Sequence, residues 1–286
     1  MSRALVFGGS GQIGMALLER LRAAGWSVDA LSRRPQVDAP GLRWLRGDFD
    51  HMPPLPEAVD AIFSCGPLDR FARWQAQAGI RSARVVAFGS TSVHVKQDSG
   101  DAGERDVARR LLDAETTLFA AGAARDVAVT VLRPTLVYGV GRDATLTRIA
   151  RMARRFGRFV LPGDADGLRQ PVHVEDLADA ALAVAMQPAA HGRAYDLPGG
   201  ETLAYRDMIR RVLACQSPPL RLHSLPMPLF RVLLALARMR GIARDLTADA
   251  IARMRDDLVF DATPARRDFG YAPRAFAPDA RMFGEP

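Results

Sequence analysis

The chain has 286 residues, of which 48% are hydrophobic and 25% charged, the ordinary composition of a globular protein with a packed core. Its formal net charge is +7, and Lys96 is its one lysine, so almost all of its basic residues are arginine. The arginines are spread along the chain and interleaved with acids rather than gathered in one stripe, which argues against a nucleic-acid-binding protein.

The cysteines, the histidines and the apolar runs exclude further classes. Cys65 and Cys215 are far apart, and the five histidines show no metal-ligand spacing, so we predict no disulfide framework and no metal. The first predicted strand begins at about residue 3, which leaves no room for a signal peptide. The most apolar run, 232–237, is far shorter than a bilayer requires. We therefore expect a cytoplasmic protein without a membrane span.

In chain order, the first half alternates short apolar segments with helical periodicity. Strands are predicted at 3–7, 27–32, 42–48, 59–66, 83–90 and 127–134. Helices are predicted at 12–24, where apolar positions recur at helical spacing, and at 104–121. Pro35 and Pro40 lie in the short link between the second and third strands and argue against a helix there. Strands alternating with helices predict an α/β fold with a doubly wound parallel sheet, a Rossmann fold.

After about residue 140 the pattern loosens. We predict a helix at 145–156 and, at 170–187, a strand that leads into a helix with acidic residues in its first turn. A proline-rich stretch at 218–228 is followed by a helix that reaches residue 242. That helix covers a second lobe in the simpler interpretation and attaches to a membrane surface in the alternative.

Gly8, Gly11 and Gly14 form a G-x-x-G-x-x-G pattern between the first predicted strand and the first predicted helix. The first glycine permits a tight turn, the second lets backbone N–H groups approach a pyrophosphate, and the third lets the helix pack closely against the sheet. The positive end of the helix dipole adds attraction for phosphate. A strand before, a helix after and a continuing βαβ pattern together predict a dinucleotide-binding loop. The alternative is a glycine-rich turn without a ligand.

The end of the second predicted strand bears on which dinucleotide is bound. An NAD site usually has a carboxylate there, which accepts hydrogen bonds from the ribose hydroxyls. In this chain Ser32 takes that place and is followed by Arg33 and Arg34, whereas Asp29 lies too early in the strand. Guanidinium groups suit a 2′-phosphate, so we predict NADP(H), with NAD less favoured. The alternative is a pair of solvated surface arginines.

Seven motifs follow one another along the chain. They are VFGGSGQIG (6–14), GDFD (47–50), VDAIFSCGP (59–67), FGSTSVH (88–94), LRPTLVYGVG (132–141), QPVHVEDLADA (170–180) and ARRDFGYAPRAF (265–276). In this order and spacing, the chain resembles the extended short-chain dehydrogenase/reductase superfamily, specifically its NAD-dependent epimerase/dehydratase branch. We expect a Rossmann domain at 1–160, which the strand and helix at 170–197 rejoin, and a smaller C-terminal substrate lobe at 161–286.

The resemblance implies cofactor contacts at the pyrophosphate, the 2′-phosphate, the adenine, the ribose and the nicotinamide. In that order, the residues are Gly8, Ser10, Gly11, Gln12 and Ile13; Arg33; Asp48 and Phe49; Cys65, Gly66 and Pro67; and Pro134. Ser90 coincides with the family's catalytic serine and would hydrogen-bond a substrate carbonyl or the nicotinamide amide.

The chain departs from this family at the pair that transfers the proton. The family has Tyr-x-x-x-Lys on the helix after the serine strand. Aligning Glu115 with the glutamate that usually follows places Val107 and Leu111 at these two positions. Lys96 is the one lysine and all four tyrosines lie after it, so the chain holds no Tyr-x-x-x-Lys. Valine and leucine transfer no proton, and acid–base help contributes about 10²–10⁴ in rate.

Two residues are candidates to replace the missing acid. His94 stands four residues after Ser90, and its imidazole suits proton transfer near neutral pH, although a surface histidine is the simpler interpretation. Tyr138 follows the proline beside the nicotinamide and would face the pocket unless it packs structurally. The sequence predicts an atypical oxidoreductase or epimerase acting on a small polar metabolite. The alternative is a non-catalytic redox sensor or scaffold protein that binds NADP(H); a homodimer is compatible with either.

Overall fold

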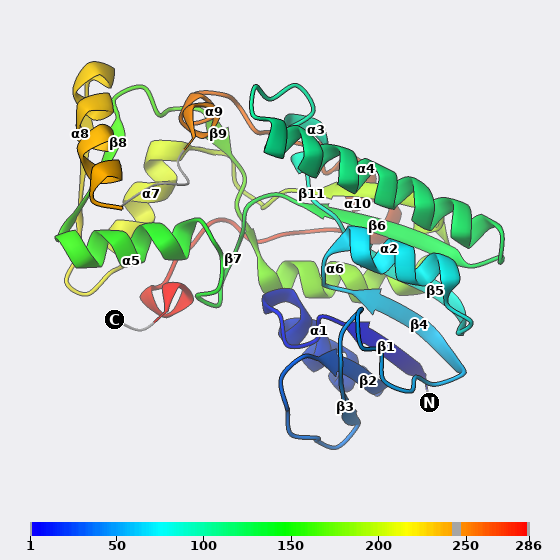
Figure 1. Cartoon of the computed structure of the whole chain (residues 1–286). Coiled ribbons are helices and arrows are strands. Elements are labelled where there is room, and N and C mark those ends of the chain that lie inside the picture. The colour runs from blue at the N-terminus through cyan, green and yellow to red at the C-terminus, as the bar shows by residue number, and fades with distance from the viewer. Residues whose placement is uncertain (1, 242–246, 285–286) are drawn as a thin grey trace.

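A computed structural model describes residues 2–241 and 247–284 (Figure 1). Three predicted ranges extend beyond the described residues. The predicted Rossmann domain begins at residue 1, the predicted C-terminal lobe ends at residue 286, and the helix predicted to follow the proline-rich stretch ends at residue 242. The centre is a seven-stranded parallel sheet with the order β11-β6-β5-β4-β1-β2-β3. Its strands are β1 (Arg3–Phe7), β2 (Ser27–Ser32), β3 (Leu42–Arg46), β4 (Ala58–Ser64), β5 (Arg81–Phe88), β6 (Ala128–Pro134) and β11 (Arg193–Leu197). The predicted doubly wound α/β fold is confirmed.

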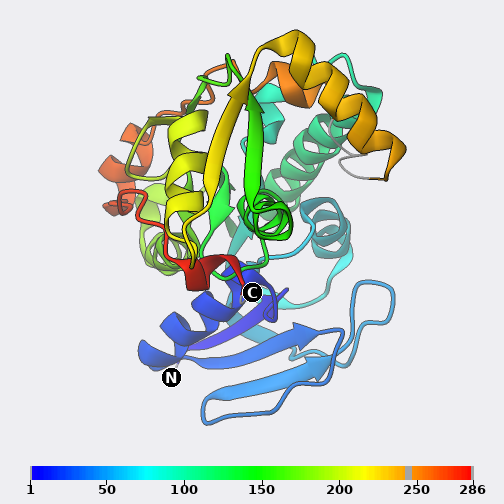
Figure 2. The same ribbon diagram turned by 90° about the vertical axis from the view of Figure 1, so that its left-hand side faces the viewer.

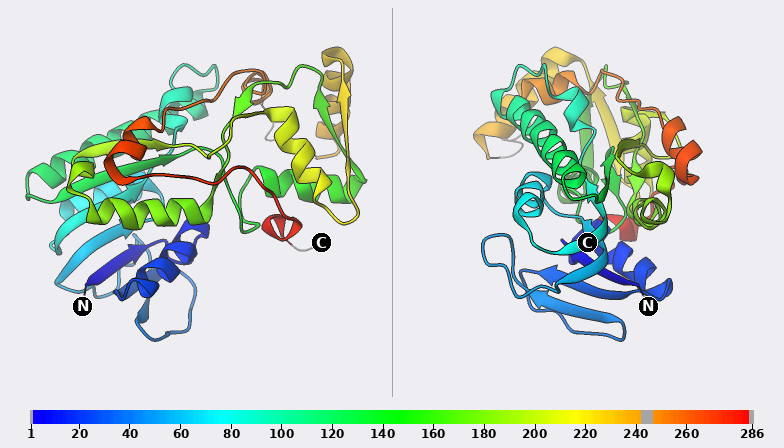
Figure 3. Two further views of the ribbon diagram at one scale, coloured as in Figure 1. Left: turned by 180° about the vertical axis from the view of Figure 1, so that it is seen from behind. Right: turned by 90° about the vertical axis from the view of Figure 1, so that its right-hand side faces the viewer.

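Helices cover both faces of this sheet, as Figures 1 and 3 show. α1 (Gln12–Ala23) and α6 (Val174–Met186) pack together on one face, and α2 (Leu68–Gln77) and α4 (Ala102–Ala123) on the other. On each face, apolar side chains of the helices and the strands form a hydrophobic cluster. The strands are therefore buried on both sides, as their near-continuous apolar runs predict for a parallel sheet.

A second region stands beside the sheet, at the left of Figure 1 and toward the viewer in Figure 2. Its hydrophobic cluster joins α5 (Leu146–Phe156) to α7 (Tyr205–Ala214). Two small sheets complete it: β8 (Arg158–Pro162) with β13 (Arg221–Leu225), and β9 (Leu168–Arg169) with β12 (Leu203–Ala204). The outermost element is α8 (Met227–Met239). The remaining short elements are α3 (Ser92–Val95), β7 (Val137–Tyr138), β10 (Val172–His173), η1 (Pro188–Ala190), α9 (Ala248–Ala252), α10 (Thr263–Phe269) and η2 (Ala280–Phe283).

Some element boundaries differ from the prediction, and several helices were not predicted: α2, α7 and the short α3, α9 and α10. The helix predicted at 104–121 begins two residues earlier, because the Asp101 side chain accepts the N–H groups of Gly103 and Glu104 at 2.8 and 3.1 Å. The strand predicted at 83–90 spans 81–88. Of these, α2 places a glutamine among its buried positions, which weakens the apolar pattern. Within the described ranges, no helix is both long enough and apolar enough to cross a membrane.

Candidate functional site

The glycine loop joins β1 to α1 in a geometry that leaves backbone N–H groups open. The chain turns at Gly8, whose φ of +70° favours glycine, and the carbonyl oxygen of Gly8 accepts the N–H of Gly11 at 2.9 Å. α1 begins directly after Gly11, and no side chain caps its first turn. A Cβ at Gly14 would overlap the carbonyl oxygen of Gly8, so glycine is required where the helix meets the loop. Uncapped N–H groups at the start of a helix attract phosphate.

Two further features of this loop fit a bound dinucleotide. A Cβ on Gly8 would lie 2.9 Å from the carbonyl carbon of Cys65 and 3.0 Å from the nitrogen of Gly66, so the loop approaches the end of β4 as closely as backbone allows. The side-chain oxygen of Gln12 is buried and has no hydrogen-bond partner among the described residues. Burial raises the pKa of the Cys65 thiol to about 12, which keeps it neutral. The Gln12 oxygen is an acceptor, so a hydroxyl or N–H group of a ligand at the loop would satisfy it, whereas a phosphate oxygen would not.

The predicted 2′-phosphate corner lies at the end of β2. Ser32 is buried; its hydroxyl donates to the Ser10 hydroxyl in the glycine loop at 3.2 Å and accepts the backbone N–H of Arg34 at 3.2 Å. Arg33 and Arg34 are exposed, and in the described part of the chain neither guanidinium has a hydrogen-bonding or ion-pair partner. Ser32 therefore fastens the strand end to the loop, with two guanidinium groups beside it.

The carboxylate on β2 is already engaged. Asp29 is buried, and its two oxygens accept from Arg3 at 2.7 Å and from Arg43 at 2.6 Å. It is therefore not free to bind a ribose hydroxyl. A further guanidinium reaches the loop from the other region of the molecule, because Nη1 of Arg142 donates to the carbonyl oxygen of Ser10 at 2.7 Å. The two residues are 132 positions apart, so no local pattern indicated this contact.

The predicted adenine contacts lie beside the end of β4. Oδ1 of Asp48 accepts the backbone N–H groups of residues 50 and 51, each at 2.9 Å, and these bonds lower the pKa of the Asp48 carboxyl. The ring of Phe49 stacks on that of Phe7, with centroids 5.3 Å apart, and the Arg70 guanidinium lies 5.8 Å from the Phe49 centroid. A Cβ on Gly66 would lie 4.0 Å from the Phe49 ring. Phe49 and Gly66 are therefore neighbours, and Pro67, which follows Gly66, is the N-cap residue of α2.

Ser90 and Pro134 come together at the ends of neighbouring strands. The N–H and the hydroxyl of Thr91 both donate to the carbonyl oxygen of Pro134 at 3.2 Å. The Ser90 hydroxyl accepts the backbone N–H of Ser92 at 3.1 Å, at the start of α3. Because parallel strands end at one edge of a sheet, this places the predicted serine and the predicted nicotinamide contact side by side.

His94 belongs to a charged cluster drawn from four elements. Its Nε2 lies 3.1 Å from Oδ1 of Asp196 on β11 and 3.3 Å from Nη1 of Arg133 on β6. Arg133 in turn forms a bidentate ion pair with Glu115 on α4, which is buried. Hydrogen bonding to Glu115 raises the pKa of Arg133. Sequence reasoning gave no site role to Arg133 or Asp196, although both charged residues interrupt apolar strands, which was the available signal.

This arrangement gives the imidazole a partner in either protonation state. When Nε2 carries a proton, it can donate to the Asp196 carboxylate; when Nε2 is bare, it can accept from the Arg133 guanidinium. The His94 side chain is 40% exposed, so a ligand can reach the ring. Nε2 is therefore engaged within the cluster, and Nδ1 has no hydrogen-bond partner among the described residues.

Tyr138 is placed differently. It is 1% exposed, and its ring packs edge-on against His173 at 5.1 Å and Phe276 at 4.9 Å. Burial raises the pKa of its hydroxyl to about 12, and this hydroxyl interacts with the backbone of Ala277. The structure does not bring Tyr138 to the His94 cluster. A role in proton transfer stays a prediction, and the geometry favours a packing role.

The α4 positions that the resemblance gives to the tyrosine and the lysine are apolar. Val107 is partly exposed, and Leu111 packs against the hydrophobic cluster under α4. Lys96 is not a replacement for the lysine, because its Nζ lies 3.7 Å from Oε1 of Glu104, a carboxylate that also pairs with both Nη groups of Arg253. This face of α4 therefore offers no proton donor.

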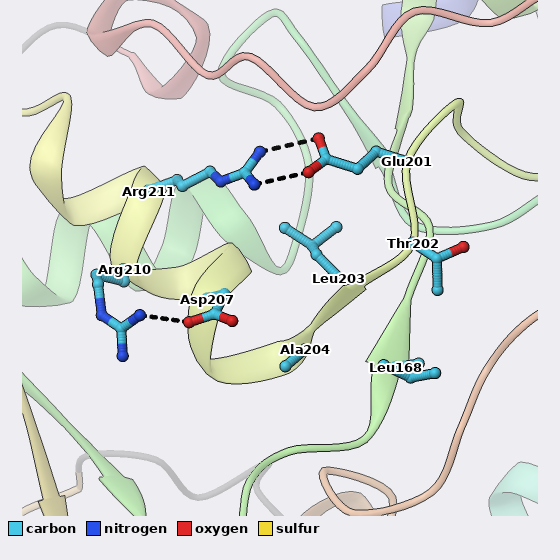
Figure 4. Close-up of a pocket in the computed structure, with 8 residues that line it drawn as sticks. All are labelled: Leu168, Glu201, Thr202, Leu203, Ala204, Asp207, Arg210 and Arg211. Atoms are coloured by element: carbon cyan, nitrogen blue, oxygen red, sulfur yellow. Dashed lines mark hydrogen bonds and ion pairs between the residues drawn. The ribbon is translucent and has the colours of Figure 1, made fainter.

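A hollow of about 590 Å³ lies in the second region, away from the glycine loop (Figure 4). Its charged side chains are paired with each other: Arg211 with Glu201 at 2.6 Å, and Arg210 with Asp207. Its other lining residues are Leu168, Thr202, Leu203 and Ala204. None of the predicted site residues lines it, and its internal ion pairs leave little charge for a ligand. Among the described residues, no group of His, Cys, Asp or Glu side chains could hold a metal ion.

Comparisons with known proteins bear on this site. A model described as the NAD dependent epimerase/dehydratase family matches residues 4–93 and 108–197. The chain is 27% identical to a 2-alkyl-3-oxoalkanoate reductase of Stenotrophomonas maltophilia, with 94% of each chain covered. It is 24% identical to a protein of the same name from Shewanella oneidensis, with 95% of this chain and 82% of the relative covered.

Solved structures share the fold at lower identity. MoeE5, in complex with UDP-glucuronic acid and NAD, has a TM-score of 0.69 and 21% identity, covering 98% of this chain and 96% of that one. WbmF from Bordetella bronchiseptica, in complex with NAD+ and UDP, has a TM-score of 0.68 and 16% identity, covering 99% of this chain and 91% of that one. The family match skips 94–107, the stretch that begins at His94 and ends at Val107.

Proposed function

Because the chain belongs to the NAD-dependent epimerase/dehydratase family, we propose that it binds NADP(H) and acts as an oxidoreductase or epimerase on a small polar metabolite. The glycine loop carries this proposal. No side chain caps the first turn of α1. The loop before it contains positions, Gly8 among them, where a Cβ would meet neighbouring backbone atoms. The buried side-chain oxygen of Gln12 has no hydrogen-bond partner among the described residues. Residues 8–14 would hold the pyrophosphate. The nicotinamide, when bound, supplies or accepts a hydride.

The charge at the end of β2 supports NADP(H) over NAD(H). Ser32 stands at the position that a ribose-binding carboxylate would occupy, and Arg33 and Arg34 follow it. Asp29 is engaged elsewhere on the strand. MoeE5 and WbmF bind NAD, so this preference would distinguish the chain from those structures. Arg142, which reaches the loop at Ser10, adds a positive charge near the pyrophosphate.

The proton-transfer step is assigned to His94. Ser90 would hold the substrate oxygen at the end of β5, and His94, four residues further on, would exchange a proton with that oxygen from Nδ1, because Nε2 is engaged by Asp196 and Arg133. When Nε2 carries a proton, it would donate to the Asp196 carboxylate, and when Nε2 is bare, it would accept from the Arg133 guanidinium. Glu115 fixes Arg133 in place. In this assignment Asp196, Arg133 and Glu115 are positioning residues, because they act through His94.

Binding and turnover test the proposal separately. Calorimetry with NADPH and NADH should show saturable binding with NADPH preferred, and no saturation with either would overturn the coenzyme assignment. NADPH oxidation should then be followed over a panel of 3-oxo acids, aldehydes, ketoses and UDP-sugars. His94→Gln should lower kcat by about 10²–10⁴ with NADPH affinity unchanged. His191→Gln, a change at an exposed histidine in a loop, is the matched control.

The apolar residues at two positions on α4 support a second candidate function. Val107 and Leu111 leave the usual proton pair without a counterpart on that helix. A non-catalytic NADP(H)-binding sensor or scaffold protein needs only the coenzyme loop. NADPH binding without turnover on any member of the panel, together with unchanged NADPH binding in His94→Gln, would favour the sensor and contradict the assignment of His94.

A further inference from the structure

α8 exposes an apolar stripe to solvent. Leu229, Val232, Leu233, Leu236 and Met239 recur at spacings of three and four residues, and each is between 41% and 75% exposed. Such spacing puts these side chains on one side of a helix. Only two α8 residues are buried against the rest of the molecule, Phe230 and Leu234. The helix therefore covers the second region with one narrow edge and presents a broader apolar face outward.

Within residues 226–241 every charged residue is an arginine. Arg231, Arg238 and Arg240 are exposed on or directly after α8, and no acidic residue occurs between 226 and 241. α8 packs against β8, and Figure 2 shows it slanting away from the β8–β13 pair toward the edge of the molecule.

This charge pattern selects among the surfaces that could cover the stripe. Pairing with a second copy through α8 would bring Arg231 and Arg240 of both copies together, and residues 226–241 contain no acid to face them. An anionic lipid surface offers both complements. Its acyl region accepts the leucine side chains, and its phosphate groups accept hydrogen bonds from guanidinium groups.

We propose that α8 is a membrane-docking helix that lies in the interface of an anionic bilayer. Its apolar stripe is inserted among the acyl chains, and its arginines contact the headgroups. The docking is peripheral. α8 and strands β1–β3 lie at opposite corners of the molecule in both Figures 1 and 2, so a docked protein keeps its glycine loop in water. The proposal does not depend on coenzyme binding, and NADPH affinity therefore serves as an independent check of folding.

Vesicle co-sedimentation of the full chain tests it. Vesicles of phosphatidylcholine alone should bind weakly, and vesicles with about a third phosphatidylglycerol should bind strongly, with less binding as salt rises. Leu229→Ser with Leu236→Ser should lower the partition coefficient by more than about tenfold, because two apolar side chains leave the interface. Arg231→Glu with Arg240→Glu should lower it by more than about tenfold by reversing charge. Leu112→Ser, which changes a leucine of similar exposure on α4, should have no effect.

Each other outcome overturns the proposal. Absence of binding to the anionic vesicles would do so, as would equal binding of the wild type and the leucine variant. A dimer in light scattering that the leucine variant converts to a monomer would assign the stripe to a second copy. The NADPH affinity and the melting temperature of every variant should match those of the wild type, so that a loss of vesicle binding cannot come from unfolding.

Discussion

Two parts of the molecule, both at the carboxyl edge of the sheet, differ in how they depend on the sequence; we call them the coenzyme end and the reaction end. The coenzyme end, which comprises the glycine loop at 8–14 and the ends of β2 and β4, is built from backbone groups and close approaches. The reaction end, which comprises the ends of β5, β6 and β11 with α3 and α4, is built from side chains. Backbone N–H groups survive most substitutions, whereas an acid or a base is lost with one. The glycine spacing at 8–14 is accordingly present at the proposed coenzyme end, whereas the chain contains no Tyr-x-x-x-Lys for the proposed reaction end.

The proposed reaction end contains a cluster of polar side chains around His94. Leu111 packs in the hydrophobic cluster under α4, whereas Glu115 on the same helix turns to Arg133, which with Asp196 contacts His94. If chemistry occurs here, it occurs at that cluster. Changes at the coenzyme end should therefore abolish binding, and changes at the cluster should affect stability or turnover while binding persists.

The largest effect is expected at Gly14. A Cβ in Gly14→Ala would overlap the Gly8 carbonyl oxygen and lie 2.8 Å from the Cα of Gly9, so loop and helix would have to separate. We expect a loss of about 3 kcal/mol in the free energy of unfolding and NADPH binding weakened more than about a hundredfold. Urea denaturation and calorimetry measure both. Gly79→Ala, where nothing lies within 4 Å of the added Cβ, is the control. Unchanged NADPH affinity in Gly14→Ala would contradict the loop assignment.

Glu115→Gln removes the charge opposite Arg133 at the reaction end. The carboxylate is buried, and the guanidinium beside it would lose its main counter-charge, so we expect about 2–3 kcal/mol of destabilisation. NADPH affinity in the folded variant should stay within about twofold of wild type, because no coenzyme contact changes. Glu19→Gln, on an exposed position of α1, should alter stability by less than about 0.5 kcal/mol. A large loss of NADPH affinity with intact stability would mean that the two ends are not separate.

Arg33→Ala with Arg34→Ala sharpens the comparison at the coenzyme end. Charge-assisted hydrogen bonds to a 2′-phosphate would be lost, so NADPH affinity should fall by about 2 kcal/mol, or about thirtyfold. NADH lacks that phosphate, and its affinity should not change. Parallel titrations with the two coenzymes make each variant its own control. Equal losses for NADPH and NADH would show that these arginines do not read the phosphate.

The smallest effect is expected for Tyr138→Phe. The ring contacts with His173 and Phe276 remain, and only the hydroxyl contact with the backbone of Ala277 is lost. We expect a change in stability of about 1 kcal/mol and an unchanged kcat on any substrate found. Thermal melting and steady-state turnover measure both. A fall of tenfold or more in kcat would return Tyr138 to the list of proton donors and weaken the case for His94.

The sequence by itself determined the fold class, the glycine loop and the absence of Tyr-x-x-x-Lys. Each depends on residues close together in the chain: the period of apolar residues in β1 and α1, the spacing of Gly8, Gly11 and Gly14, and the pattern on α4. Such local requirements are legible because backbone geometry and helix periodicity act over a few residues.

Only the tertiary structure decided which side chains meet. His94, Glu115, Arg133 and Asp196 come from α3, α4, β6 and β11, and they touch because parallel crossovers carry distant strand ends to one edge of the sheet. The same holds for the burial of Tyr138, the contact of Arg142 with the glycine loop and the exposure of the apolar α8 stripe. Burial and long-range contact depend on how the elements pack, and no spacing along the chain specifies that packing.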